Sequence, residues 1–171
     1  IVLGDLLMRC LYRVRPYEPT KGSANALHRK WRDICIDSLT SAHPKYSYAR
    51  LCRGIVADFD AFPIDETLKK PRVGVVGEIL VKYHPDANNH VVDVIESQDC
   101  EAVVPGIMEF MTTRPYITDW NEKNLGMGGN KKLYSLMRWG LDRYLNPVRA
   151  AIDLAHGKFS QDLPMPELVK K

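Results

Sequence analysis

Apolar residues recur at every third or fourth position through the first 60 residues, the spacing that gathers them on one face of an α-helix. A first helix is expected over residues 1–15, ending at Arg15 because the residue before a proline avoids the helical region. Ser23 is a plausible N-cap for a second helix, and a third follows at about 45–59. The pattern predicts a helical part over residues 1–62, with three antiparallel helices joined by short turns.

The pattern changes after a polar connector, residues 63–72, that prolines bracket. Residues 73–76, Val-Gly-Val-Val, are apolar and mostly β-branched, which predicts a short buried strand, and residues 101–104 predict a second one. The valines between them predict a helix that begins near Asn88 or Asn89. The order strand, helix, strand predicts a βαβ unit with parallel strands within residues 71–113.

The remaining chain predicts one short helix at 107–111 and a loop at 118–130, with extra strands possible near 116–118. The loop contains Gly-Met-Gly-Gly at 126–129, which resembles a phosphate-binding loop only superficially. No strand precedes it and no Lys-Ser/Thr pair follows at the required spacing, so a flexible loop is expected.

A stripe of apolar residues predicts a long helix from Lys131 to about His156, within residues 130–157. Pro147 lies inside it and should kink it or mark a joint, and Gly157 is a natural stop. The expected fold is therefore a helix-rich α/β domain over residues 1–171. Its small parallel sheet, at about 73–104, would be covered by the N-terminal helices and by this long helix.

The connection after the first strand is longer than the two to six residues usual between a strand and a helix, and long connections tend to be functional. In an open α/β sheet, ligands bind beyond the carboxyl ends of the strands, where a helix start favours an anion. The connection supplies a flexible glycine, an acid, a histidine and amides suited to such a site. The candidate ligand-binding residues are Gly77, Glu78, Tyr83, His84, Asn88 and Asn89.

Glu78 and His84 also suggest an acid–base pair, because histidine titrates near neutrality. The alternative is structural: both side chains hold a long loop in shape, and Asn88 only caps a helix. The spacing of Gly74 and Gly77 does not fit the G-x-G-x-x-G motif of dinucleotide sites, and no known catalytic motif appears elsewhere. The catalytic residues therefore stay unassigned.

Composition and charge limit the classes of partner that we expect. Hydrophobic residues make up 45% and charged residues 26%, as in a globular protein, and the net charge of +3 does not suggest a nucleic-acid partner. No apolar run is long enough for a membrane span, so a cytoplasmic protein is expected. Because the chain begins at Ile1 inside an apolar pattern, we expect it to be part of a larger protein.

The four cysteines are expected to be structural. Cys10, Cys35, Cys52 and Cys100 lie far apart without a C-x-x-C pair, whereas metal sites usually contain at least one close pair. The first three fall on apolar helix faces, where a thiol behaves as a small hydrophobic group. No metal site is predicted in this chain.

A family resemblance rests on the contiguous segment PRVGVVGEILVKYHP, residues 71–85, continued by residues 87–89 and by EAVVP at 101–105. The segment resembles proteins known as 2-hydroxyacyl-CoA dehydratase activase-related, or CoA-substrate-specific enzyme activases. Asp5-Leu6-Leu7 and Arg15-Pro16-Tyr17-Glu18 are similar to the same proteins, so the resemblance covers most of the chain.

The resemblance implies a large protein that couples ATP-dependent activase modules to a dehydratase-like region. That region stacks Rossmann-like lobes and holds a [4Fe-4S] cluster on cysteines, and this chain would be its middle lobe. The dispersed cysteines here do not match the family's cluster motifs, and no glycine-rich ATP site is present. Cluster and ATP would therefore be bound by other parts of the protein, and no family catalytic residue maps onto this chain.

Three functional hypotheses follow. In the first, the chain is a lobe of a dehydratase-related iron–sulfur protein, not catalytic alone, whose residues 77–89 line a cleft for a CoA thioester or a partner. In the second, it is a non-catalytic interaction lobe that packs against other domains. The third, an independent nucleotide-binding enzyme, lacks its glycine signature. A cleft should present Glu78 and His84 to solvent, whereas a docking loop should bury residues 79–81 against another domain. In a truncated chain those apolar residues would be exposed and would favour self-association.

Overall fold

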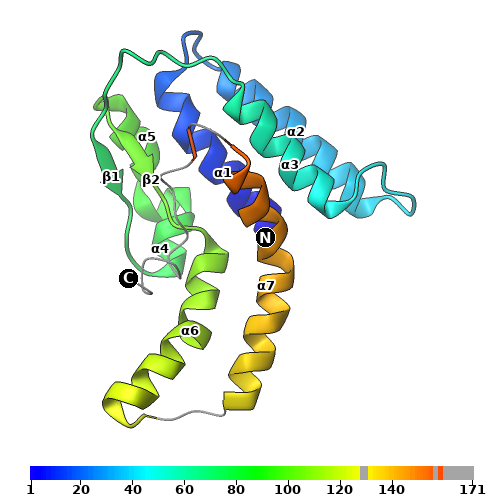
Figure 1. Ribbon diagram of the computed structural model, residues 1–171. Helices are drawn as coiled ribbons and strands as arrows, with labels where there is room; N and C mark the ends of the chain where they lie inside the picture. The colour runs from blue at the N-terminus through cyan, green and yellow to red at the C-terminus, as the bar shows by residue number, and fades with distance from the viewer. Residues whose placement is uncertain (128–130, 156–157, 160–171) are drawn as a thin grey trace.

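The computed structural model describes residues 1–127, 131–155 and 158–159. The predicted three N-terminal helices are confirmed, and Figure 1 shows the chain reversing direction from each helix to the next. A 3₁₀ turn, η1, follows the first helix directly. The elements are α1 (Val2–Val14), η1 (Arg15–Tyr17), α2 (Ser23–Thr40) and α3 (Tyr48–Asp60).

The hydrophobic core lies among these helices and the end of the last one. Leu6, Val14, Ile55 and Phe59 are each at most 2% exposed, as their helical spacing predicts. The core also includes Ala151 and Ala155 from the C-terminal helix. The amphipathic pattern along the first 60 residues therefore identified most of the core, although Leu39, on the predicted apolar face of α2, is 70% exposed.

One glycine sets how closely α2 and α3 approach. The Trp31 indole lies directly over Gly54, where a Cβ atom would come within 2.4 Å of Trp31 Cη2. The indole Nε1 donates a hydrogen bond to Asp58 at 2.9 Å. Any larger residue at position 54 would displace the indole from this place.

The sheet has two parallel strands, β1 (Arg72–Gly74) and β2 (Glu101–Val103), so the predicted βαβ order is confirmed at this level. The prediction of a buried strand at residues 73–76 is only partly right, because of these four residues only Val75, 8% exposed, is buried. All three residues of β1 are exposed, and Val76 is 84% exposed. β2 packs against α1, whereas β1 has no comparable contact with any helix in the described residues, and a buried parallel strand needs cover on both faces.

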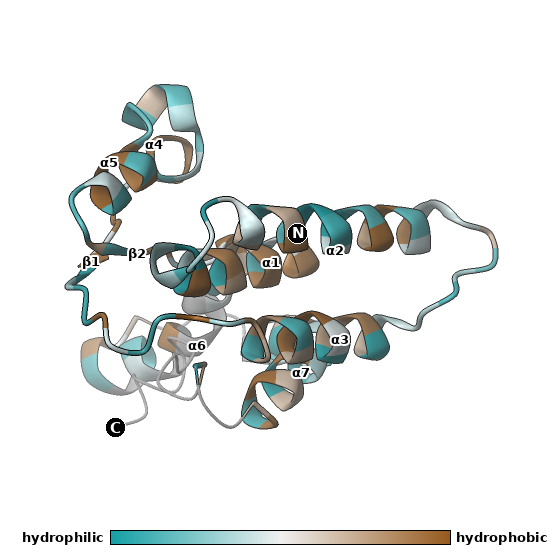
Figure 2. Cartoon of the chain, turned by 90° about the horizontal axis from the view of Figure 1, so that it is seen from above, coloured by the Kyte–Doolittle hydropathy of each residue, from teal (hydrophilic) through white to brown (hydrophobic). Residues whose placement is uncertain are grey.

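The long connection after β1 is mostly helical, so its prediction as an extended loop is wrong. It contains a short helix, a 3₁₀ turn and the helix that precedes β2: α4 (Ile79–Tyr83), η2 (Pro85–Asn88) and α5 (Val91–Ser97). Seen from above in Figure 2, α4 and α5 lie on one side of the strands, and the helical core lies on the other. None of the residues of α4 is buried.

The segment after β2 differs most from the prediction. Helix α6 runs from Ile107 to Leu125, where a short helix, possible strands near 116–118 and a loop from 118 were expected. It ends at Gly126, whose φ of 63° favours glycine. The apolar residues of α6 are spread around the helix, so no periodic stripe marked it in the sequence. Residues 128–130 lie outside the described residues.

Helix α7 (Lys131–Asp153) confirms the predicted long helix and continues through Pro147. It ends slightly before the expected limit, and both His156 and Gly157 lie outside the described residues. Its second half packs against α3, and α6 and α7 run beside each other away from the helical core (Figure 1). In the described part of the chain, no helix combines the length and the apolar character that a membrane span requires.

Candidate functional site

The candidate segment begins with a glycine in a conformation that suits few other residues. Gly77 has a φ of 141°, and open space surrounds the position of its missing side chain. The next residue, Glu78, is exposed, and its carboxylate accepts a hydrogen bond from the Leu80 amide at 2.9 Å. Glu78 is therefore the N-cap of α4, which is a structural use of its charge.

His84 occupies the opposite end of the same helix as its C-cap. The two caps are six residues apart, which corresponds to about 9 Å along a helix axis. The His84 amide donates to the Leu80 carbonyl at 2.9 Å, and the His84 carbonyl accepts from the amides of the following turn. The structure therefore exposes both Glu78 and His84 but does not bring them together as an acid–base pair.

The two candidate asparagines shape the turn into α5. Asn88 Oδ1 accepts from the Val91 amide at 3.2 Å, and Asn88 Nδ2 donates to the Lys82 carbonyl at the same distance. Val91 is the first residue of α5, so Asn88 holds the turn into this helix, although the N-cap position is His90. Asn89 and His90 both have positive φ, of 54° and 53°. Asparagine tolerates this conformation better than most residues, so Asn89 lets the chain turn sharply.

Tyr83 connects α4 to the end of β2. Its hydroxyl donates a hydrogen bond to the Pro105 carbonyl. Burial, with smaller contributions from the carboxylates of Asp5 and Glu109, raises the pKa of Tyr83 to about 12. The phenol therefore stays protonated at neutral pH and acts as a donor that holds α4 in place.

At the carboxyl edge of the sheet, a carboxylate of the chain itself occupies the start of the helix that follows β2. Helix α6 begins beyond β2, and Asp5 Oδ2 accepts from its Met108 amide at 2.8 Å. A Cβ atom on Gly106 would lie 2.8 Å from the same oxygen, so glycine is needed for the approach of α1. Beside it, Arg9 pairs with Glu109 at 3.4 Å, and burial raises the pKa of Glu109. Sequence reasoning missed Asp5, because its partner is more than 100 residues away.

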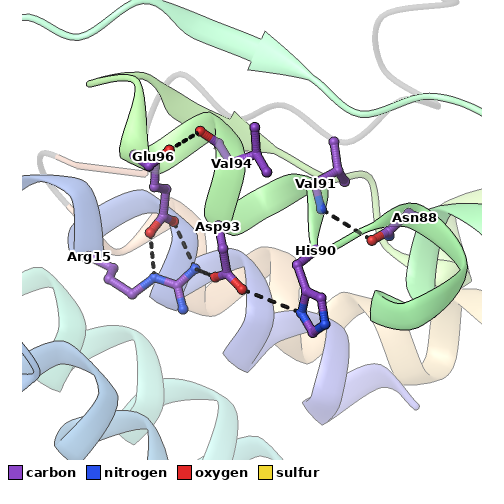
Figure 3. A network of polar contacts seen from close by, with 8 residues as sticks. Arg15, Asn88, His90, Val91, Asp93, Val94 and Glu96 are labelled. Atoms are coloured by element: carbon purple, nitrogen blue, oxygen red, sulfur yellow. Dashed lines mark hydrogen bonds and ion pairs between the residues drawn. The ribbon is translucent and has the colours of Figure 1, made fainter.

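A second polar network joins α5 to the end of α1 (Figure 3). Both nitrogens Nε and Nη2 of Arg15 donate to the Glu96 carboxylate, at 2.8 and 2.9 Å. Burial raises the pKa of Glu96, and the Arg15 guanidinium partly offsets that rise. Asp93 lies 3.9 Å from Arg15 and 3.6 Å from His90 Nδ1. These contacts anchor α5 on the helical core.

The most buried charge is Glu101, at the start of β2, with its side chain 2% exposed. It accepts from Arg13 at 2.5 Å and from the Tyr17 hydroxyl at 2.9 Å, and Arg72 approaches its other oxygen at 3.0 Å. The carboxylate thus ties both strands to α1 and η1. The sequence signal for it was a charged residue opening an otherwise apolar strand.

The cysteines are as expected for structural residues. Cys10, Cys35 and Cys52 are buried, Cys100 is partly exposed, and none of the four forms a disulfide. Burial raises the pKa of the Cys52 thiol to about 11. Across residues 1–127, 131–155 and 158–159, no three histidine, cysteine or acidic side chains cluster as metal ligands would.

Comparisons with protein-family models, with curated proteins and with solved structures gave no match to this chain. The family resemblance of residues 71–105 therefore stays a prediction from the sequence.

Proposed function

We propose that this chain is a non-catalytic interaction lobe of a larger protein, and that the larger protein is of the 2-hydroxyacyl-CoA dehydratase/activase-related type. The Rossmann-like character of the lobe and a cytoplasmic location belong to the same proposal. So do a [4Fe-4S] cluster and an ATP site in other domains. The other domains of that protein would be the main partners.

The observation that carries the proposal is the internal use of polar groups at the carboxyl edge of the sheet. Asp5 occupies the start of α6, and Glu78 occupies the start of α4. Tyr83 and Asn88 are also engaged with backbone atoms of the chain. An anionic substrate would have to displace carboxylates that already satisfy these helix ends, which disfavours a catalytic centre here.

The apolar side chains around α4 support docking. Val76, Leu80 and Val81, which we call the α4 patch, are 84%, 60% and 48% exposed and lie within six residues. Helix α4 has none of the buried side chains that normally hold a short helix in place. Exposed apolar groups that gather in this way favour contact with a neighbouring domain.

The α4 patch is tested with the neutral dye Nile red, which brightens on apolar surfaces. We expect the double variant Leu80→Lys/Val81→Lys to lower the dye fluorescence while its circular dichroism stays unchanged. The matched control is Ile36→Lys/Leu39→Lys, because that exposed pair lies on α2 among Asp33 and Asp37. Equal losses in both variants would contradict a docking patch at α4.

A second candidate function is the CoA-thioester cleft, which the exposure of both Glu78 and His84 favours. Gly77 leaves open space in front of the same edge. In this alternative, a thioester would bind the chain directly, and Glu78→Ala and His84→Ala would weaken its binding. The interaction lobe predicts no such binding.

A further inference from the structure

A groove of about 820 Å³ lies between α3 and α7, away from the sheet and its candidate residues. Its α7 wall is a single helix face, since the lining residues recur every three or four positions. Among the residues that line it are Ala49 and Arg53 of α3, Trp139, Arg143 and Asn146 of α7, and Leu154 directly after α7.

The walls of the groove are held in fixed positions. The Tyr48 hydroxyl of α3 donates to the Tyr144 carbonyl of α7 at 2.7 Å, and the two rings meet edge to face. On the inner side of α7, Ala151 and Ala155 are buried in the core. A groove with fixed walls binds a partner at a lower entropic cost than a surface that must first become ordered.

The charge of the groove is positive and unneutralised. Arg53 and Arg143 are exposed, and neither has a hydrogen-bond or ion-pair partner in the described parts of the chain. The carboxylate that lines the groove, Asp142, instead pairs with Arg149 at 2.9 Å. An occupant therefore needs carboxylates or other anions at positions that face the two arginines.

The apolar part of the groove indicates the size of the occupant. Trp139 and Leu154 are 67% and 61% exposed, so the groove does not enclose a small molecule as ligand pockets do. From Trp139 to the end of α7 at Asp153, the wall spans about 21 Å, the length of a helix of about 15 residues. Tryptophan and arginine are also the residue types that contribute most to binding at protein interfaces.

We propose that the groove between α3 and α7 binds an acidic amphipathic helix presented by a neighbouring domain. The apolar face of that helix packs on Trp139 and Leu154, and its glutamates or aspartates pair with Arg53 and Arg143. This inference deepens the proposed interaction function by assigning a partner chemistry to a surface separate from the α4 patch.

The test uses the 171-residue chain and a labelled synthetic helix of about 15 residues, with leucines on one face and glutamates beside them. Fluorescence anisotropy measures its binding. We expect the acidic peptide to bind and a peptide with lysines in place of glutamates not to bind. Arg53→Glu/Arg143→Glu should weaken binding at least tenfold, which is about 1.4 kcal/mol. Trp139→Ala should also weaken it at least tenfold.

The matched control is Arg29→Glu/Lys69→Glu, which changes the net charge equally at exposed positions that do not line the groove. It should leave the affinity within about twofold, because distant exposed charges are screened. Equal binding of both peptides, or unchanged binding to Arg53→Glu/Arg143→Glu, would overturn the proposal.

Two further outcomes would assign the groove to another occupant and also overturn it. One is ATP that displaces the peptide and loses its own binding in Arg53→Glu/Arg143→Glu. The other is a dimer, seen by sedimentation, that the same variant dissociates. Leu80→Lys/Val81→Lys leaves the groove intact, so failure of the groove and failure of the α4 patch are distinguishable.

Discussion

Glu101 provides the sharpest test of how the sheet is attached to the helical core. In Glu101→Gln, the side chain keeps its size and one acceptor oxygen but loses the charge that faces Arg13 and Arg72. Breaking a buried ion pair costs about 3–5 kcal/mol. The side chains of Arg13 and Arg72 are 24% and 38% exposed and regain some water, so we expect a loss of about 3 kcal/mol in the free energy of unfolding.

Urea unfolding followed by circular dichroism measures this loss. For a domain of this size, about 3 kcal/mol lowers the midpoint by about 1.5 M urea. The matched control is Glu96→Gln, whose acid is 15% exposed and has a pKa already raised by burial. Burial disfavours the charged carboxylate there, and an uncharged amide avoids this penalty. Glu96→Gln should therefore lower the free energy of unfolding by about 1 kcal/mol or less.

Double-mutant cycles separate the two arginines. Combining Glu101→Gln with Arg13→Gln should give a coupling of about 2 kcal/mol, as expected for a short hydrogen bond between charged groups. The cycle with Arg72→Gln should give less than about 1 kcal/mol, because Arg72 is more exposed. A loss below about 1 kcal/mol for Glu101→Gln, or equal couplings, would refute the view that this carboxylate anchors the strands.

Three further predictions concern the helix contacts. Gly106→Ala pushes a methyl group against the Asp5 carboxylate and should lower the free energy of unfolding in urea by about 1 kcal/mol. Asp5→Ala should lower it by a similar amount. The loss in the double variant should be less than the sum of the two. Gly54→Ala should displace the Trp31 indole and shift its fluorescence, with a net loss of about 1–2 kcal/mol; unchanged stability would contradict the packing. The pKa of the Cys52 thiol is raised from 9.0 to about 11. Its contribution to the free energy of unfolding is therefore complete below pH 9 and is lost as the pH rises to 11. The unfolding free energy of the wild-type chain should fall by about 2–3 kcal/mol over this pH range because of Cys52. Cys52→Ala should lack this part of the fall, measured as unfolding free energy against pH.

The sequence predicted the elements whose own pattern determines them. The stripe from Leu3 to Val14 identified α1 and its buried face, and the stripe beyond Lys131 identified α7. Helix α6 lacks such a stripe and starts where Asp5, a residue distant in sequence, caps it. Its length therefore depended on a tertiary contact that no local pattern reveals.

In the candidate site, too, local features were predictable from the sequence and tertiary contacts were not. Asn88 was recognised as a residue that could support the start of a helix, because that signal is local, and it does accept from the first amide of α5. The exposure of β1 depends on which strand packs against α1, and the hydrogen-bond and ion-pair partners of Glu101 come from two distant segments, residues 13–17 and Arg72. The long connection after β1 was interpreted as a loop, although the Glu78 carboxylate caps α4 and Asn88 holds the turn into α5.

The most direct test of the proposed interaction lobe is calorimetric titration of the folded chain with coenzyme A, several acyl-CoAs and ATP. Because Asp5 and Glu78 already occupy the helix starts at the carboxyl edge, we expect no heat of binding with any of them. Binding that weakens at least tenfold, or about 1.4 kcal/mol, in Glu78→Ala or His84→Ala would contradict this account. It would establish the segment at residues 77–89 as a ligand site.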